Sequence, residues 1–204
     1  MENAGDMPLQ SSHLRVTAPS LWVRRFSPLI PKGGTVLDLA CGGGRHVRYF
    51  LNLGYKVVAL DRDVAHVADL ADKPGIEVIE ADLEGGGAWP VEGRTFDAVV
   101  VVNYLYRPLF RHLFEAVGKN GLFIYETFAS GNEKFSRPRN PDHLLRSGEL
   151  LEITRRRLQV VAYEHGLVDR GPTTGVMQRI CAVNDLRASE REDGEPEPHG
   201  VRPT

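Results

Sequence analysis

Short apolar runs alternate with amphipathic segments through the middle of this sequence, so strands and helices are expected in turn. The apolar runs are rich in β-branched and aromatic residues and are bounded by glycine, proline and polar residues. They predict strands near 35–40, 56–60, 76–80, 97–102, 121–127, 159–166 and 176–183.

Three of the intervening segments have the spacing of an amphipathic helix. The clearest follows the first strand, where Val47, Phe50 and Leu51 share a face and a glycine at position 54 stops the helix. The other two apolar faces consist of Val64, Val67 and Leu70, and of Leu109, Leu113 and Val117. A strand, helix, strand repeat of this kind predicts a parallel sheet with helices on both faces.

The end of the chain departs from this repeat. Only VDRGPTTG separates the last two predicted strands, which is too short for the helix of a parallel crossover. These two strands should therefore form an antiparallel hairpin. The expected fold class is α/β, a Rossmann-like doubly wound sheet of seven strands, mostly parallel with a C-terminal antiparallel hairpin.

The two ends of the chain lack a periodic apolar pattern. Residues 1–13 are polar, and residues 186–204 mix charge, proline and glycine, so both are expected to be disordered. Residues 14–185 remain as one domain, as a length of 204 residues favours. The N-terminus has no apolar core of signal-peptide length and no run could span a bilayer, so a cytoplasmic protein without membrane contact is expected.

Composition disfavours several kinds of site. The formal net charge is −2, from 25 basic and 27 acidic residues, so the chain as a whole does not attract nucleic acid or membranes electrostatically. Local basic patches can still bind them. Cys41 and Cys181 lack CxxC spacing, which favours buried thiols in a reducing compartment over a disulfide or zinc site. The seven histidines show no ligand spacing, so no metal is expected.

The sequence VLDLACGGGRH contains a glycine turn directly after the first predicted strand. Gly42, Gly43 and Gly44 allow the backbone to approach a ligand, and the following helix directs free N–H groups toward it. Asp61 follows Gly42 by nineteen residues, at the end of the second strand, where a carboxylate can accept hydrogen bonds from both hydroxyls of a ribose. The expected ligand therefore contains a ribose.

Two features oppose a ligand that carries phosphate. The turn lacks the third glycine of G-x-G-x-x-G, where Val47 stands, and it lacks the Lys-Ser/Thr of a P-loop. Asp38, inside the first strand, would repel a pyrophosphate but would suit an ammonium group. S-adenosylmethionine combines an ammonium, a sulfonium and a ribose, and it carries no phosphate.

Four motifs in order carry a resemblance to a known family: VLDLACGGGRH, VVALDRD, IEVIEADLE and FDAVVVVNYL. They resemble the cofactor motifs of class I S-adenosylmethionine-dependent methyltransferases, over about residues 33 to 184, and the small bacterial tellurite-resistance type is most similar. The family pattern acidic-x-Gly-x-Gly-x-Gly is matched at Asp38, Gly42 and Gly44, while Ala40 replaces the first glycine.

The resemblance implies a role for each strand end. Asp61 would hold the ribose diol, and Asp82 would meet the adenine amino group beside Leu83. Asn103 would border the methionine part. The expected cofactor residues are Asp38, Ala40, Gly42, Gly44, Arg45, Asp61, Arg62, Asp82, Leu83 and Asn103. From the residues alone, Asp61 or Asp63 could cap the next helix, and Asp82 could be an ordinary loop residue.

The substrate is expected at the ends of the fourth and fifth strands, in NYLYRPLF (103–110) and YETFASGNEKFSRPRNPDHLL (125–145). Because a sulfonium already activates the methyl group, positioning supplies most of the rate and a catalytic base is optional. Candidate catalytic residues are Tyr104 and Glu126, and candidate substrate contacts are Tyr106, Arg107, Arg137 and Arg139. The alternatives are ordinary packing for the two tyrosines, and an ion pair of Glu126 with Arg107 or Arg137.

Two further segments have competing interpretations. Residues 128–145 are predicted to form a lid over the substrate, with a mobile entry at Gly131 and Asn132. The three arginines at 155–157 could bind an anionic substrate or RNA. A solvated helix face is the favoured interpretation, because arginine dominates the basic residues and clusters of it arise easily.

The function that the residues favour is methyl transfer from S-adenosylmethionine to an acceptor, a small molecule rather than RNA. A module that only binds the cofactor is the alternative, and an NAD-dependent oxidoreductase is a more distant one. The intact set of Asp38, Gly42, Asp61 and Asp82 favours the enzyme. No separate substrate domain is present to name the acceptor atom.

Overall fold

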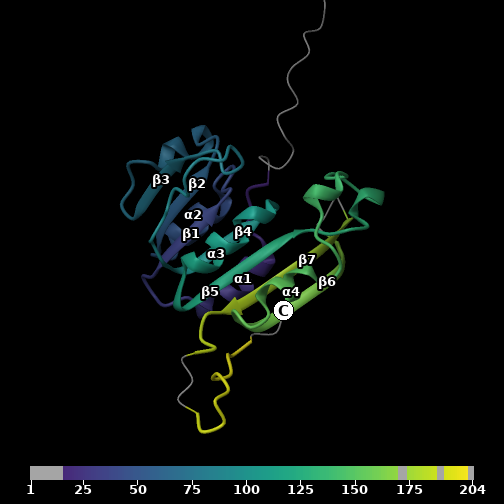
Figure 1. Ribbon diagram of the computed structural model, residues 1–204. Helices are drawn as coiled ribbons and strands as arrows, with labels where there is room; N and C mark the ends of the chain where they lie inside the picture. The colour runs from purple at the N-terminus through teal and green to yellow at the C-terminus, as the bar shows by residue number, and fades with distance from the viewer. Residues whose placement is uncertain (1–15, 170–173, 188–190, 202–204) are drawn as a thin grey trace, which may run out of the picture.

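Seven strands form one mixed sheet in the order β3-β2-β1-β4-β5-β7-β6 (Figure 1). The computed structural model describes residues 16–169, 174–187 and 191–201, so the predicted disorder of residues 1–13 lies outside it. The strands are β1 Thr35–Leu39, β2 Lys56–Asp61, β3 Ile76–Glu80, β4 Phe96–Val102, β5 Val117–Phe128, β6 Gln159–Asp169 and β7 Thr174–Val183. β1 to β5 pair in parallel, whereas β7 is antiparallel to both β5 and β6, which confirms the predicted fold class.

Short helices connect the strands. The α-helices are α1 Leu21–Phe26, α2 Arg45–Asn52, α3 Phe110–Ala116 and α4 Glu149–Thr154, and the 3-10 helices are η2 Ser27–Leu29, η3 Ala65–Leu70, η4 Arg107–Leu109, η5 Asn132–Lys134 and η6 Pro141–His143. The first predicted helix is α2, and the second is the 3-10 helix η3. The third begins as η4 and continues as α3, but it ends before Val117, which was expected on its apolar face.

β5 begins at Val117, earlier than its apolar pattern predicted. Val117 pairs with Phe96 and Leu122 pairs with Ala98, so the residues between them form a bulge. Within it, Asn120 has a left-handed backbone with φ of 60°. The extra residues of a bulge interrupt the alternation of apolar and polar positions, which is why the pattern located only the regular part of the strand.

Helices cover both faces of the sheet, as predicted. On one face α1 and α2 bury Phe26 and Phe50 against the strands, and on the other face α3 and α4 bury Leu113 and Leu150. Phe50 is 0% exposed. Truncating such a side chain to alanine costs about 3–5 kcal/mol, so the packed sheet gives a firm support to the loops at its carboxyl ends.

Helix α1 was not predicted, although a local signal for it exists. Oγ of Ser20 accepts the N–H of Trp22 at 3.1 Å and so caps the helix. Trp22, Val23 and Phe26 are buried. A serine directly before apolar residues with this spacing is an N-terminal helix signal.

Other features concern the chain as a whole. Cys41 and Cys181 are buried free thiols, as predicted. None of the helices in the described part of the chain is long and apolar enough to cross a membrane. In the same part, no group of three His, Cys, Asp or Glu side chains is placed to hold a metal ion. Residues 191–201 contain no helix or strand, and the disorder of the tail stays a prediction.

Candidate functional site

The strand order reverses at β1, which pairs with β2 on one side and with β4 on the other. In sheets of this kind, ligands bind at the carboxyl ends of the strands where the order reverses. Ala40 and Asn103 directly follow the two central strands, and both have left-handed backbones, with φ of 54° and 60°. Left-handed residues other than glycine are strained, and they cluster at functional sites. This end of the sheet is therefore the candidate site.

The glycine turn is fixed to the end of β2. The N–H of Gly42 donates to Oδ2 of Asp61 at 2.8 Å, and the N–H of Cys41 donates to the main chain of β2 at 3.2 Å. Gly44 caps the start of α2 with φ of 72°. A Cβ at position 44 would stand 2.4 Å from Cγ1 of Val67, so only glycine fits there without moving η3.

Asp61 and Asp63 support different turns at the end of β2. Oδ1 of Asp61 accepts the N–H of Asp63 at 3.1 Å, so each carboxylate oxygen of Asp61 holds one backbone N–H. Oδ1 of Asp63 accepts the N–H of Ala65 at 3.1 Å, where η3 begins. Asp63 is thus the residue that supports the helical turn, while half-buried Asp61 faces the glycine turn and keeps a free lone pair on each oxygen.

Asp38 lies inside β1, below the glycine turn, and is 1% exposed. Burial, and then repulsion from Asp61, raises the pKa of Asp38 from 3.8 to about 7. The positive charge of Arg45 and a hydrogen bond from the backbone N–H of Val47 act in the opposite direction and lower this pKa. Oδ2 of Asp38 is buried and has no hydrogen-bond partner. A buried carboxylate with an unpartnered oxygen is costly to ionise, and a cation bound beside it would reduce that cost.

His46 is the second residue of α2 and lies next to Asp38, with Nδ1 4.0 Å from Oδ1 of the carboxylate. Nε2 of the ring accepts the backbone N–H of Ser20 at 3.1 Å. Burial, and then the charge of Arg45, lowers the pKa of His46 to about 3. The ring is therefore neutral at pH 7 and does not neutralise Asp38.

Glu126 is buried near the carboxyl end of β5, and its contacts differ from those predicted. Oε2 of Glu126 accepts the hydroxyl of Ser20 at 2.9 Å and lies 3.4 Å from Nε of Arg179. Arg179 also reaches Glu164 at 3.5 Å. The alternative interpretation, an ion pair of Glu126 with Arg107 or Arg137, is wrong, because this carboxylate instead links α1 to β5 and β7.

The end of β3 brings a third carboxylate toward the site. The N–H that follows β3, at Ala81, donates to the carbonyl of Asp61 at 2.9 Å. The next residue, Asp82, is exposed, and its Oδ1 accepts the N–H of Glu84 at 2.9 Å. A hollow beside it is lined by Asp82, Leu83, Gly87, Ala88, Trp89, Pro90, Leu109 and His112. Asp82 therefore stabilises the turn to Glu84 and also borders this hollow.

Arg45, Arg62 and Asn103 complete the predicted cofactor set. Nη1 of Arg45 donates to the carbonyl of Ala18 at 3.2 Å, which brings the segment before α1 across the start of α2. Arg62 is exposed directly after β2. The N–H of Asn103 donates to the carbonyl of Glu126 at 2.8 Å, which fixes the left-handed turn after β4 to β5. All three lie at the same end of the sheet.

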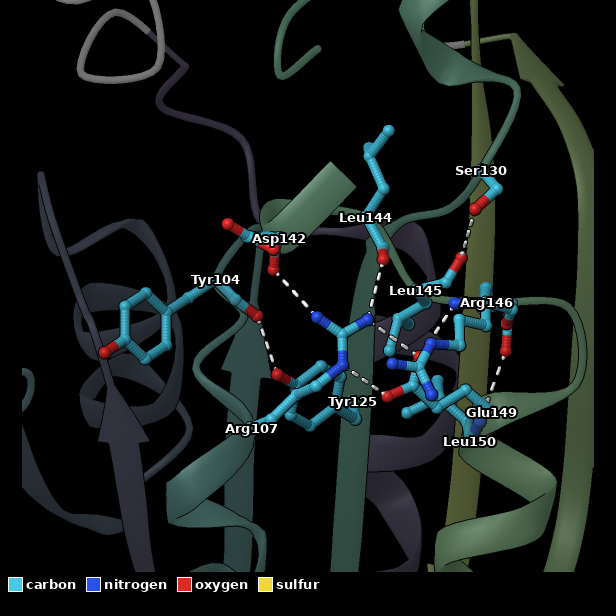
Figure 2. A network of polar contacts seen from close by, with 11 residues as sticks. Tyr104, Arg107, Tyr125, Ser130, Asp142, Leu144, Leu145, Arg146, Glu149 and Leu150 are labelled. Atoms are coloured by element: carbon cyan, nitrogen blue, oxygen red, sulfur yellow. Dashed lines mark hydrogen bonds and ion pairs between the residues drawn. The ribbon is translucent and has the colours of Figure 1, made fainter. Parts of the chain in front are cut away.

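Tyr104 and Tyr106 are half-buried after β4. The carbonyl of Tyr104 accepts the hydroxyl of Tyr125 at 2.7 Å (Figure 2). The hydroxyl of Tyr104 is itself buried without a hydrogen-bond partner. Burial, and then the charge of Glu84, raises the pKa of this hydroxyl well above its usual value. At neutral pH it can donate a hydrogen bond but cannot act as a base.

Arg107 is the centre of a polar network that joins η4 to the start of α4 (Figure 2). Its Nε and Nη2 donate to the two carboxylate oxygens of Glu149 at 2.7 and 2.9 Å. Nη1 and Nη2 donate to the carbonyls of Asp142 and Leu144 at 2.9 and 2.8 Å. Burial opposes ionisation of Glu149, but hydrogen bonds from Arg107 and from the Arg146 N–H lower its pKa overall. Because its donors hold the fold together, Arg107 does not suit the predicted substrate contact.

Residues 128–145 are held at both ends, by a parallel bridge between Ala129 and Leu145. Asn132 is fully buried, and its Oδ1 accepts the N–H of Val176 at 3.2 Å. The side-chain amide of Asn132 donates to the carbonyl of Pro138 at 3.1 Å. The prediction of a mobile entry at Asn132 is therefore wrong, since this residue anchors the segment to β7.

The arginines of the predicted substrate side are not gathered at one place. Arg137 and Arg139 are exposed between η5 and η6. The run 155–157 follows the end of α4 at Thr154, and Arg156 has a left-handed backbone with φ of 61°. The interpretation of 155–157 as a helix face is therefore wrong.

Comparison with known proteins fits this geometry. Residues 36–121 match the family model described as a methyltransferase domain. Over these residues the chain is similar to methyltransferase domains, and solved structures of such enzymes share its fold. The crystal structure of TehB from Haemophilus influenzae is similar to it, with a TM-score of 0.65 and 19% identity over 80% of this chain and 61% of TehB. A search of curated proteins gave no match.

Two more solved structures resemble this chain. An S-adenosylmethionine-dependent methyltransferase from Mesorhizobium loti has a TM-score of 0.62 and 18% identity over 78% of this chain and 95% of its own. The second is the 1,6-didemethyltoxoflavin-N1-methyltransferase of Burkholderia thailandensis, with 1,6-didemethyltoxoflavin and S-adenosylhomocysteine bound. It has a TM-score of 0.58 and 17% identity over 86% of this chain and 79% of its own. At these identities the similarity establishes the fold of this chain.

The candidate site also depends on residues that the sequence analysis did not select. Ser20, His46 and Arg179 link α1 to the site, and Glu149 holds Arg107. Of these, only Ser20 has a local signal, as a helix cap before an apolar run. The other contacts join residues that are distant in sequence, and no local sequence pattern predicts them.

Proposed function

We propose that this protein binds S-adenosylmethionine where the strand order reverses at β1, and that it transfers the methyl group to a small molecule. The observation that carries the proposal is a pair of carboxylates around one glycine turn. Asp61 holds the N–H of Gly42 at the rim, and Asp38 lies buried below with an unpartnered oxygen. A ligand with both a diol and an ammonium group complements this pair.

The residues present fit this cofactor better than a dinucleotide. An ammonium group near Asp38 would offset the cost of ionising a buried carboxylate, whereas a pyrophosphate would be repelled by Asp38 and Asp61. A ribose diol can use the free lone pairs of Asp61. Exposed Asp82 can accept a hydrogen bond from the amino group of an adenine ring beside half-buried Leu83.

When bound, S-adenosylmethionine supplies a methyl group already activated by its sulfonium, and the transfer leaves S-adenosylhomocysteine. The chain contributes position: the left-handed turns at Ala40 and Asn103 set the floor of the site, and Tyr104 and Tyr106 border its acceptor side. Glu126 is engaged by Ser20 and Arg179, so the acceptor proton is released to water rather than to this carboxylate.

A small-molecule acceptor is favoured by the site and by the similar structures. The acceptor side has two half-buried tyrosines and no gathered arginines, which suits a flat organic molecule better than a phosphate backbone. The Burkholderia thailandensis relative binds a small heterocyclic substrate. Exposed Arg137 and Arg139 on the adjoining loop are the residues that an acidic substituent of the acceptor would meet.

The test separates an enzyme from a binding module. Calorimetry should give binding of S-adenosylhomocysteine and none of NAD. The protein is then incubated with methyl-labelled cofactor and a cell extract, and the extract is separated into small molecules, RNA and protein. Label in the small-molecule fraction supports the proposal. Binding without any labelled product indicates the non-catalytic module, and label in RNA overturns the acceptor class.

A further inference from the structure

A hollow of about 430 Å³ lies at the end of the sheet opposite the candidate cofactor site. It is lined by Arg155, Arg156, Arg157, Asn184, Leu186 and Arg187. The N–H of Asn184 donates to the carbonyl of Gly121 at 3.0 Å, at the start of the regular part of β5. The cofactor residues follow the other ends of β1, β2 and β4. In Figure 1 the yellow segment after β7 hangs below the sheet, away from the loop at 129–145.

Four arginines bring a concentrated positive charge to this hollow. Among the described residues, Arg155, Arg156 and Arg187 form no ion pair with an acidic side chain. The guanidinium of Arg157 lies over the ring of Phe114, 5.4 Å from its centre. Like charges held this close repel one another, and a bound anion would remove that repulsion.

The walls of the hollow are fixed by the fold. Thr154, directly before the arginines, is fully buried, and its hydroxyl donates to the carbonyl of Leu150 at 2.7 Å. Leu158, directly after them, is 4% exposed. On the other wall, the side-chain amide of Asn184 donates to the carbonyl of Val117 at 2.8 Å. Arg155, Arg156 and Arg157 therefore project from a short, anchored turn.

The strained backbone of Arg156 adds a second observation. Its φ of 61° is a left-handed conformation that a long side chain rarely adopts. Strain of this kind costs of order 1–3 kcal/mol and persists where the surroundings demand it, often at ligand sites. Here it turns the chain so that three consecutive side chains all line one hollow.

We propose that this hollow binds a small molecule with two or more phosphate groups, such as a nucleoside diphosphate or triphosphate. Its volume lies within the range of about 300–1,000 Å³ that small-molecule sites occupy. Guanidinium groups match phosphate oxygens in pairs, and their flat faces stack on rings. Half-buried Leu186 offers an apolar surface for a base. The site is separate from methyl transfer and does not depend on it.

A single-stranded RNA is the other occupant that four arginines could attract, and the shape opposes it. RNA-binding grooves follow the backbone with a continuous basic path, whereas these arginines surround one hollow. The chain as a whole carries a formal net charge of −2, so it offers no wider field to a polyanion. The small anion is therefore the occupant to which the proposal commits.

The experiment is a calorimetric titration of the full chain with adenosine triphosphate and with pyrophosphate at low salt. The double variant Arg155→Gln/Arg156→Gln should weaken binding of both by about tenfold or more, the loss expected when two charge-assisted contacts are removed. Arg187→Gln, from the opposite wall, should weaken the same binding. The control Arg24→Gln/Lys32→Gln removes two exposed charges elsewhere and should change the affinity less than about twofold.

The outcomes decide the proposal. Circular dichroism should show that all variants stay folded, since the changed side chains are exposed. S-adenosylhomocysteine binding should be equal in all of them, which separates this site from the cofactor site. Absence of triphosphate and pyrophosphate binding at millimolar concentration overturns the proposal, as does an equal loss in the control. Binding of a short single-stranded RNA, with none of pyrophosphate, assigns the hollow to RNA instead.

Discussion

The backbone N–H of Ser20 donates to Nε2 of His46 at 3.1 Å, and this contact fixes which nitrogen of the neutral ring carries the proton. Because Nε2 accepts, the neutral ring carries its proton on Nδ1, which faces Oδ1 of Asp38 at 4.0 Å. The pKa of His46 is lowered to about 3 by burial and then by Arg45, so the ring gives Asp38 no positive partner at pH 7. The charge of Asp38 therefore stays available to a cationic ligand.

The substitution Asp38→Asn should remove a pH dependence of stability. Burial raises the pKa of Asp38 from 3.8 to about 7. The folded state therefore holds this proton more tightly than the unfolded state, and the stability it contributes is complete below about pH 4 and is lost as the pH rises through about 7. Relative to wild type, the variant should gain at least about 1 kcal/mol between about pH 4.5 and pH 8.

Urea unfolding at both pH values measures this difference. His46 contributes stability that is present above about pH 6.5 and is lost as the pH falls toward about 3, but it does so in both proteins and cancels in the comparison. Asp82→Asn, at an exposed carboxylate, is the control and should show no such change. A pH-independent difference between wild type and Asp38→Asn would mean that the buried carboxyl titrates normally.

Cofactor binding should be linked to the same proton. An ammonium group favours ionised Asp38, so the affinity for S-adenosylhomocysteine should rise by about five- to tenfold between about pH 6 and pH 8 in wild type. Titration calorimetry at a series of pH values should give a flat profile for Asp38→Asn. If both profiles are the same, the ammonium group does not lie near this carboxylate.

Ala40→Gly should stabilise the protein. Ala40 has φ of 54°, which an L residue adopts at a cost of about 1 kcal/mol and glycine adopts freely. After the greater entropy of unfolded glycine is subtracted, we expect a gain of about 0.5 kcal/mol in the free energy of unfolding. The control is Ala98→Gly, inside β4, which should instead lose about 0.5–1 kcal/mol. Thermal unfolding that gives losses for both would contradict strain at position 40.

The parts of this protein that were predictable from its sequence depend on local rules. Strand positions follow from apolar runs, and the antiparallel hairpin follows from the length of one connection. Asp61 was selected because it ends the strand after the glycine turn, whereas Asp82 was placed by the family resemblance; the structure puts both at the carboxyl ends of neighbouring parallel strands. Ala40 and Asn103 were placed by the family pattern, and the structure adds their left-handed backbones.

The parts that were missed depend on contacts between distant segments. Arg107 and Glu149 are 42 residues apart in sequence, and Ser20 and Glu126 are 106 apart. Nothing in either local segment reveals its partner, so the sequence suggested Glu126 or a substrate for Arg107 and did not predict Glu149. The helix-face interpretation of Arg156 is wrong for a different reason. A left-handed backbone at a residue other than glycine cannot be predicted from the residue type.

Asp61→Asn should weaken S-adenosylhomocysteine binding by at least about tenfold, because one acceptor oxygen becomes a donor and loses its charge. The same change should cost about 1–2 kcal/mol of stability, since Oδ2 of Asp61 accepts the N–H of Gly42 at 2.8 Å. Asp63→Asn is the matched control, because the contacts of this side chain are the N–H of Ala65, where η3 begins, and Nε2 of His66 at 3.9 Å. Calorimetry that gives equal losses for the two variants would assign the effect to the loop and not to a ribose contact.

Arg107→Gln should destabilise the protein by about 3 kcal/mol, because it leaves the carboxylate of Glu149, whose side chain is 9% exposed, without its cationic partner. It also removes donors from the carbonyls of Asp142 and Leu144. The matched control is Arg111→Gln, since Arg111 pairs with exposed Glu115 within α3 and its loss should leave the stability nearly unchanged. Urea unfolding measures both. If Arg107→Gln has the same urea midpoint of unfolding as wild type and only methyl transfer falls, Arg107 contacts the substrate and does not hold η4 to α4.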